Sequence, residues 1–387
     1  MSNGKKKFKI SGTLIFNLIV AVLTVYLLVY FFVSDGGIID LLKTPNSFNI
    51  WWIIVAVLAY DFNIFIDSIV TLIYIRTQFK DFKFFEAVKV ALVGVFFGAV
   101  TPSNTGGQPM QLFLLSKMKV GVGFGSACMT QKFIVYQIIS TAFSIFAVIV
   151  RFNYLQDAFT NFWSSAFIVL GFTVQLAVTA LFLVVSFSRK LTKKIINALY
   201  WLMVHIKFIK NPDRKKERLE KEFAMFHRAN TELMHDWKRL TAIYALVLIQ
   251  VFAILSVPYF IYLSFGMPEI AVANGQQPAS MFDFVCIQSF VLFTSNLVPL
   301  PGASGGAELA FSIYFTPFFV IGGVQKIKPA ILLWRLTTYY ASIIISAPFS
   351  YYTKGRKEFE ENELDKLTEQ EYEELEASEK AEASAEK

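Results

Sequence analysis

The chain has 387 residues, of which 55% are hydrophobic and 17% are charged, and its mean hydropathy is +0.51. Soluble domains carry roughly 25% charged residues, so this composition excludes an ordinary soluble domain and favours a membrane protein. A net charge of +7 would suggest nucleic-acid binding in a soluble protein. Here the basic residues follow membrane topology instead, and we expect no nucleic-acid partner.

Six apolar segments are long enough to cross the hydrocarbon core, which takes about 20 residues. In chain order they are Ser11–Val33, Ile50–Ile75, Phe124–Val150, Trp163–Phe187, Thr241–Phe265 and Ala330–Tyr351. The first follows the basic start KKKFKI and lacks the small-residue cleavage site of a secretory signal, so we expect it to be a retained span. The fold class predicted is therefore an all-α polytopic membrane protein.

Basic residues are concentrated at the N-terminus, in the long loop at 188–239 and just after the last span, at 354–357. By contrast, the Ser34–Asn49 and Gly266–Ser280 connections hold one Lys between them. The positive-inside rule then places both termini and the long basic loop in the cytoplasm. Lys326 and Lys328 are the exception to this orientation.

We divide the chain into a transmembrane domain at 1–352 and an acidic cytoplasmic tail at 353–387, which is expected to be disordered or a frayed helix. Within the basic loop, NPDRKKERLEKEF predicts an amphipathic helix that lies near anionic headgroups or is simply solvated. The three histidines of this loop, His205, His227 and His235, are expected at its surface.

Two further apolar segments are interrupted by polar turns. Phe84–Val100 breaks at TPSNTGGQP and Met281–Leu300 breaks at PGASGG, and each resumes as an apolar helix. Both breaks read Pro-x-x-(Thr/Ser)-Gly-Gly, so we interpret them as an internal repeat. Because three spans lie between them, the first hairpin enters from the cytoplasm and the second from outside. The sequence thus predicts two re-entrant broken-helix hairpins in an inverted repeat; the alternative is a pair of Gly/Pro kinks in ordinary spans.

A break of this kind leaves backbone groups unpaired, which lipid does not tolerate, so the breaks should face protein or a polar cavity. The helix that restarts after each break also points its partly positive N-terminus at the gap, which favours an anion. The residues expected to contact a substrate are Thr101, Ser103, Asn104, Thr105, Gly106, Gly107, Gln108, Ser304, Gly305, Gly306, Glu308, Arg335 and Tyr339. Glu308 has a second reading, as a cap on its own helix.

Ionisable residues inside the apolar runs are further candidates, because each is costly there. We expect a charge-relay or headgroup role for Asp61, Asp67, Lys89 and Lys132, although the two lysines would also fit as side chains that snorkel to the interface. No metal site or cofactor is expected, since Cys128 and Cys286 stand alone and the chain has no Walker-type GxxxxGK[ST] motif.

At these positions the sequence resembles the flippase-like transmembrane domain of bacterial lysylphosphatidylglycerol synthases, over about Phe8 to Tyr352. The likeness rests on TPSNTGGQPMQLFLL, PLPGASGGAE and LLWRLTTYY. It implies a helical domain with two re-entrant hairpins, in a bacterial cell membrane, that moves or accommodates a phospholipid. It also carries Pro301, Gly302, Glu308 and Arg335 over as site residues.

This chain departs from the family pattern at two places. Gln111 stands where many relatives have Arg, and Gln131-Lys132 replaces a common Glu-Arg pair, so both positions bear on which headgroup is accepted. The soluble aminoacyl-transferase domain is missing, its place taken by the acidic tail. We therefore do not expect an enzyme.

The leading functional hypothesis is binding and translocation, by flipping or scrambling, of an anionic or aminoacylated phospholipid through a polar cavity at the midplane. The alternative is a non-transporting scaffold or accessory subunit of a lipid-modifying or glycosyl-transfer enzyme, which would dock through the basic loop and the acidic tail. An intramembrane enzyme ranks last, because no Ser/His/Asp or Cys/His arrangement is apparent.

Overall fold

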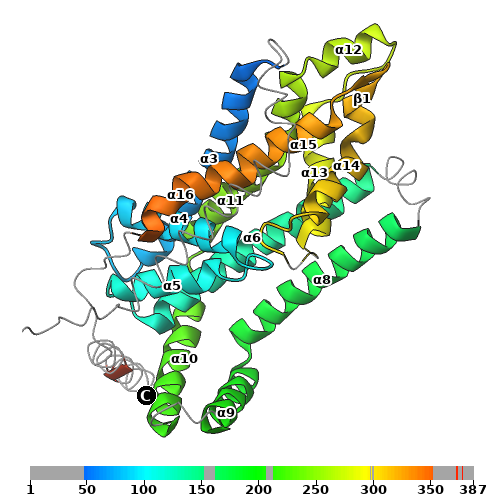
Figure 1. The fold of residues 1–387 in the computed structure, drawn as a ribbon. Helices are drawn as coiled ribbons and strands as arrows, with labels where there is room; N and C mark the ends of the chain where they lie inside the picture. The colour runs from blue at the N-terminus through cyan, green and yellow to red at the C-terminus, as the bar shows by residue number, and fades with distance from the viewer. Residues whose placement is uncertain are drawn as a thin grey trace, which may run out of the picture.

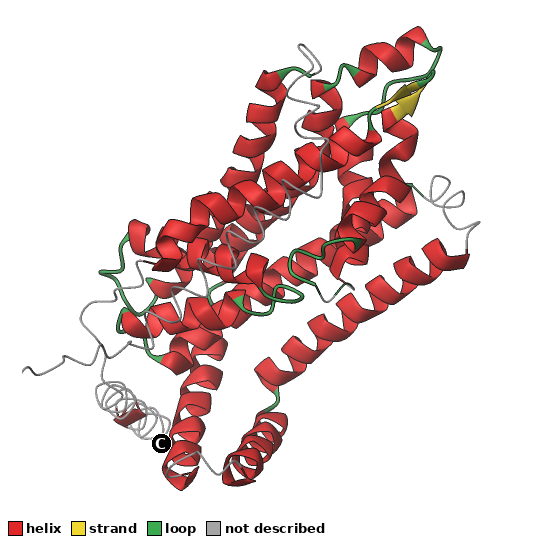
Figure 2. Cartoon of the chain, viewed as in Figure 1, coloured by secondary structure: helices red, strands yellow, loops and turns green. Residues whose placement is uncertain are grey.

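The computed structural model describes residues 48–151, 162–205, 212–296, 298 and 300–351, together with positions 372, 373 and 377 of the tail. The expected first span and most of the expected tail lie outside the described residues. The described part is built from helices and one short β-hairpin (Figures 1 and 2).

The elements follow the chain in a simple order. They are α3 (Ile50–Ile75), α4 (Phe84–Val100), α5 (Gly107–Lys117), α6 (Val122–Val150), α8 (Phe162–Phe187), α9 (Arg189–His205), α10 (Pro212–His235), α11 (Trp237–Ser264), α12 (Met267–Ala273), α13 (Met281–Asn296), α14 (Gly306–Phe319), β1 (Val320–Ile321), β2 (Val324–Gln325), α15 (Ile327–Arg335), a π-helix η1 (Leu336–Tyr340) and α16 (Ala341–Tyr351).

Within the described residues, five helical segments are long and apolar enough to cross a membrane. They are Ile50–Ile75, Val122–Val150, Val169–Phe187, Trp237–Ser264 and Ile327–Ser350. Each corresponds to one of the predicted spans, and the first matches its prediction residue for residue. The chain is therefore an all-α, multi-pass membrane protein.

The two ends of the helical bundle carry different elements. Helices α9 and α10 lie at one end, and α12 and the β-hairpin lie at the other (Figure 1). The long helices α3 and α11 run antiparallel between them, since the Asn49 N–H at the start of α3 donates to the Ser264 carbonyl at the end of α11, at 2.7 Å. Most of the basic loop thus lies at the α10 end, whereas Lys326, beside the β-hairpin, lies at the other.

The helix α10 is not simply solvated. Its first half is exposed, but its second half packs against α6, where Phe226 and Leu233 join the apolar core. The Glu222 carboxylate accepts from the Gly123 N–H, and Asn230 pairs with Gln131, each at 2.5 Å. This helix is anchored to the bundle by polar contacts that the sequence does not reveal.

The expectation that all three histidines lie at the surface is wrong for His227. Its ring contacts the Thr192 hydroxyl at 2.9 Å and the Ser186 carbonyl at 3.2 Å, while His205 and His235 are exposed. Burial lowers the pKa of His227 from its ordinary value, because desolvation disfavours the imidazolium. His227 therefore acts as a neutral link between α10 and the helices α8 and α9.

The two interrupted helix pairs enter the bundle from opposite ends. The pair α4–α5 starts and ends near α10, whereas α13 follows α12 and α14 leads into β1 (Figure 1). Each pair has its own apolar cluster: Phe96 and Leu114 belong to one, and Phe284 and Phe315 belong to the other. Both pairs are thus firmly packed on their apolar sides, and this packing fixes where their polar turns lie.

Candidate functional site

The first polar turn, which we call break 1, comprises residues 101–106. Ser103 and Asn104 adopt left-handed φ angles of 50° and 59°, and α5 then restarts at Gly107. The chain folds back tightly because α4 has glycines where α5 and the turn approach. A Cβ at Gly98 would collide with the Asn104 side chain, and one at Gly94 would collide with Gln111. Pro and paired Gly end one helix here and allow the next to begin.

The second polar turn, break 2, comprises residues 300–305 and repeats the first part of this backbone path. Gly302 and Ala303 take left-handed φ angles of 60° and 52°, and α14 restarts at Gly306. These positions lie 199 residues after Ser103, Asn104 and Gly107. The likeness between the two sequence motifs therefore extends to the left-handed part of the turn, but it ends at the last residue, where Gly106 has a φ of −82° and Gly305 a φ of 84°.

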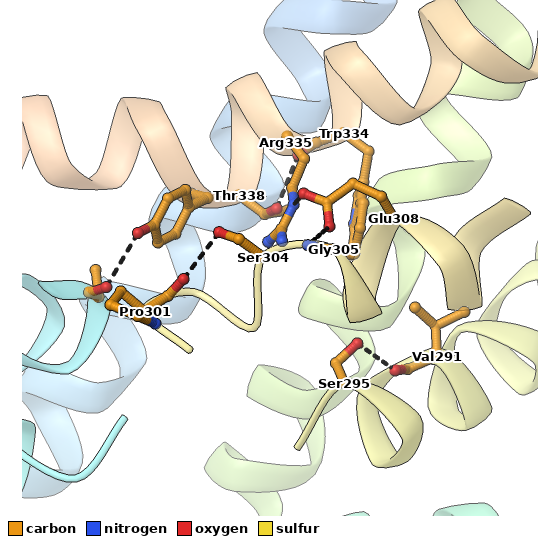
Figure 3. Close-up of polar contacts among 11 residues, drawn as sticks. Val291, Ser295, Pro301, Ser304, Gly305, Glu308, Trp334, Arg335 and Thr338 are labelled. Atoms are coloured by element: carbon orange, nitrogen blue, oxygen red, sulfur yellow. Dashed lines mark hydrogen bonds and ion pairs between the residues drawn. The ribbon is translucent and has the colours of Figure 1, made fainter. Parts of the chain in front are cut away.

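Side-chain hydrogen bonds also match between the breaks. The Thr105 hydroxyl donates to the Pro102 carbonyl at 2.8 Å, and the Ser304 hydroxyl donates to the Pro301 carbonyl at 2.9 Å (Figure 3). Each bond closes the turn three residues after its proline, and a local bond of this kind holds a turn without a regular helix or sheet.

The helix restarts, however, are capped differently. In break 1 the Gly106 N–H donates to the Thr101 hydroxyl at 2.8 Å. In break 2 the equivalent N–H, of Gly305, donates to the Glu308 carboxylate at 2.6 Å (Figure 3). A neutral hydroxyl in one break thus corresponds to a carboxylate in the other, and the reading of Glu308 as a helix cap is confirmed.

The two breaks contact each other. Their backbones pair in an isolated antiparallel bridge between Pro102 and Pro301. Tyr339 joins α4 to break 2, because its hydroxyl donates to the Ala99 carbonyl in the last turn of α4, at 3.1 Å, and its ring fills the space where Gly302 lacks a Cβ. The π-helix η1 carries Tyr339 and so brings the last candidate span to the junction.

This junction lies near the middle of the bundle. Tyr339 comes twelve residues after Ile327 and eleven before Ser350, the limits of the last candidate span. At 1.5 Å per residue it is about 18 Å and 17 Å from the two ends. Ser103, Asn104 and Thr105 are nonetheless exposed there. Polar side chains are thus accessible at a depth where a membrane protein would otherwise present apolar ones.

Arg335 is the cation of this junction. Its side chain is 7% exposed, and its Nε donates to the Glu308 carboxylate at 2.6 Å (Figure 3). The guanidinium also lies over the rings of Trp334 and Tyr339, 5.3 Å from each ring centre. Cation–π contacts and the ion pair together hold it in one orientation.

Two buried donors at this junction have no acceptor among the described residues. They are Arg335 Nη2 and Trp334 Nε1. Buried donors are almost always satisfied in folded proteins, so an unsatisfied pair indicates where water or a ligand completes the site. Because both groups only donate, the missing partner is a hydrogen-bond acceptor.

The other expected substrate contacts differ in exposure. Gly107, Gln111 and Tyr339 are buried, Gly305 is exposed, and intermediate burial is found for Thr101, Gly106, Gln108, Gly302, Ser304, Gly306 and Glu308. Gln111 packs against Gly94 inside the α4–α5 pair rather than at the junction. Trp334 and the Ala99 carbonyl belong to the junction but were not expected; an indole next to Arg in LLWRLTTYY is the sequence signal for the first.

The ionisable candidates in the spans are not brought to the breaks. Lys132 on α6 forms an ion pair with Asp67 on α3 at 3.0 Å and also donates to Thr71 at 3.1 Å. Lys132 is therefore a partner of Asp67 rather than a side chain that snorkels. Lys89 is half-buried in α4, and Asp61 lines a separate groove. Among the described residues, no three His, Cys, Asp or Glu side chains are placed to hold a metal ion.

Comparisons with known proteins place the chain in a family. Residues 18–346 match the model of the lysylphosphatidylglycerol synthase TM region. An uncharacterized Mycoplasma pneumoniae protein is 25% identical over 85% of this chain and 84% of its own. A UPF0104 membrane protein of Archaeoglobus fulgidus is 24% identical over 73% and 80%. No solved structure matches significantly. The chain therefore belongs to the lysylphosphatidylglycerol synthase transmembrane-region family.

Proposed function

We propose that this protein binds phospholipids and moves their headgroups across the membrane through the junction of the two breaks. The observation that carries the proposal is the contact between two polar breaks near mid-depth, beside a buried guanidinium with an unsatisfied donor. A phosphate oxygen is a suitable acceptor, because Arg binds phosphate with well-matched geometry. The headgroup would pass along the breaks while its acyl chains stay in lipid.

The proposal includes a topology. The pairs α4–α5 and α13–α14 are re-entrant hairpins of opposite orientation that form an inverted repeat, and the predicted segment at 11–33 adds a sixth span. Their matched left-handed residues and their entry from opposite ends support this interpretation. Inverted repeats with broken helices commonly place substrates near the bilayer midplane. The basic α9 and α10 support cytoplasmic termini and a location in the cell membrane.

Reconstituted liposomes provide the test. Purified protein should let a headgroup-labelled phosphatidylglycerol equilibrate between leaflets, as measured by quenching of the outer label. Arg335→Gln should slow this by about tenfold or more, the value of one charged hydrogen bond. The rate for Arg335→Lys should fall between those of the wild type and Arg335→Gln, since lysine keeps the charge but not the planar guanidinium. Lys193→Gln, on the exposed face of α9, is the matched control and should behave as the wild type.

The anionic or aminoacylated nature of the lipid is tested in the same system by varying the labelled headgroup. If folded wild-type protein leaves every headgroup asymmetric, the translocation proposal fails and the scaffold hypothesis takes its place. If Arg335→Gln and Lys193→Gln transport equally well, the junction at Arg335 is not the translocation site, and that part of the proposal fails.

A further inference from the structure

A groove on the outer surface of the described helices contains one charged residue. It has a volume of about 300 Å³ and lies between α3, α4 and α16, with walls that include Phe65, Phe84, Val88 and Ile345. Asp61 is the only charged side chain in its lining and is half-buried. No described residue forms an ion pair or hydrogen bond with this carboxylate, and the described side chains around it are apolar except for Ser68.

The depth of Asp61 makes this placement costly. It lies eleven residues after Ile50 and fourteen before Ile75, or about 17 Å and 21 Å from the two ends of α3. An ionised carboxylate at such a depth needs a partner or water, and otherwise takes up a proton. The charged residues of α4, Glu86 and Lys89, do not line the groove, and α16 carries no charged residue.

Asp67, on the same helix, shows the contrasting case. Its carboxylate is compensated by Lys132 at 3.0 Å, and this pair connects α3 to α6. Of the two acidic residues in the span, Asp61 is the one that has no charged partner among the described residues.

We propose that Asp61 is a proton-binding site that opens laterally to the acyl chains through the α3–α4–α16 groove. Protonation lets the groove fill with hydrocarbon, and ionisation follows when water or a polar headgroup reaches it. Coupling of this cycle to lipid movement rests on the proposed function, whereas proton binding itself does not.

Carbodiimide labelling tests proton binding without measuring transport. The reagent is N,N′-dicyclohexylcarbodiimide, which is hydrophobic. The proton of a carboxylic acid moves to a nitrogen of the carbodiimide, and the carboxylate oxygen adds to its central carbon. An acyl shift from oxygen to nitrogen then gives a stable N-acylurea, with no change of oxidation state. Only a protonated carboxyl that lipid can reach reacts in this way. Mass spectrometry of the full chain in liposomes would locate the adduct.

We expect labelling of Asp61 and at least about tenfold less of Asp67, since the Asp67 carboxylate is engaged by Lys132 and does not line the groove. Labelling of Asp61 should fall about tenfold per pH unit once the carboxyl is mostly ionised. Asp61→Asn should remove the adduct and raise the unfolding temperature, because it mimics the protonated form. Asp67→Asn should lower that temperature by leaving Lys132 unpaired. Absent or pH-independent labelling of Asp61, or preferential labelling of Asp67, would overturn the proposal, whatever the transport assay shows.

Discussion

Break 1 and break 2 share the first part of their backbone path but differ in their chemistry and in the conformation of their last residue. Both place two consecutive residues at left-handed φ, close the turn with a hydroxyl bond to the proline carbonyl and restart a helix five residues after that proline. They differ at the position three residues into each restarted turn, where break 1 has Pro109 and break 2 has Glu308. Break 1 is therefore neutral, whereas break 2 recruits Arg335.

This difference separates what makes a break from what makes a site. Pro, Gly and a short hydroxyl side chain suffice to interrupt a helix and satisfy the turn. The charged chemistry comes from one carboxylate that both caps α14 and pairs with Arg335. Four pairs of variants, each with one member from either helix pair, test this difference.

The largest difference is expected at the first left-handed position of each break. Gly302→Ala should cost about 2 to 4 kcal/mol, because the new Cβ is strained at positive φ and collides with the Tyr339 ring. Ser103→Ala should cost less than about 0.5 kcal/mol, since Ser103 already has a Cβ and is exposed. Thermal unfolding midpoints in one detergent measure both; equal losses would show that the ring contact is unimportant.

The two caps come next. Glu308→Gln should cost about 2 kcal/mol, less than a fully buried pair because Glu308 is 32% exposed, and it leaves Arg335 without its counter-charge. Thr101→Val should cost about 1 to 2 kcal/mol, because it removes two neutral hydrogen bonds, one from the Gly106 N–H and one to the Phe97 carbonyl. The double variant Glu308→Gln/Arg335→Gln should recover part of the first loss. A purely additive result would mean that the two side chains do not stabilise each other.

The hydroxyl bonds that close the turns should have equal value. Thr105→Val and Ser304→Ala each remove one bond to a proline carbonyl, and each should cost about 0.5 to 1 kcal/mol. Chemical denaturation of the two variants side by side checks this. A loss confined to one break would show that the two hydroxyl bonds contribute unequally to the free energy of unfolding.

The smallest effect is a gain in stability. Ala303 is held at a φ of 52°, which costs a residue with a Cβ about 1 kcal/mol or more, so Ala303→Gly should stabilise the fold by about 0.5 kcal/mol. Asn104→Gly at the matched position should change little, since Asn tolerates this conformation. Paired melting curves compare them, and destabilisation by Ala303→Gly would mean that its methyl group contributes packing.

The spans and the breaks could be predicted from the sequence because their causes are local. A predominantly apolar segment of 26 residues, Ile50–Ile75, forms one helix, and Pro102 and Pro301 each stand where a helix has ended. The partners of the charged residues could not be predicted in this way. Lys132 pairs with a residue 65 positions away, and His227 is buried by contacts to α8 and α9.

The sequence by itself determined that this protein crosses a membrane several times and interrupts two helices in the same manner, because hydropathy and the backbone limits of Pro and Gly act over a few residues. The tertiary structure decided that the interruptions meet, since Tyr339 bonds a carbonyl 240 positions earlier in the chain. It also decided that Asp67 pairs with Lys132, while Asp61 has no charged partner among the described residues. Contacts of this kind depend on which helix faces pack together, and no local pattern of residues encodes that choice.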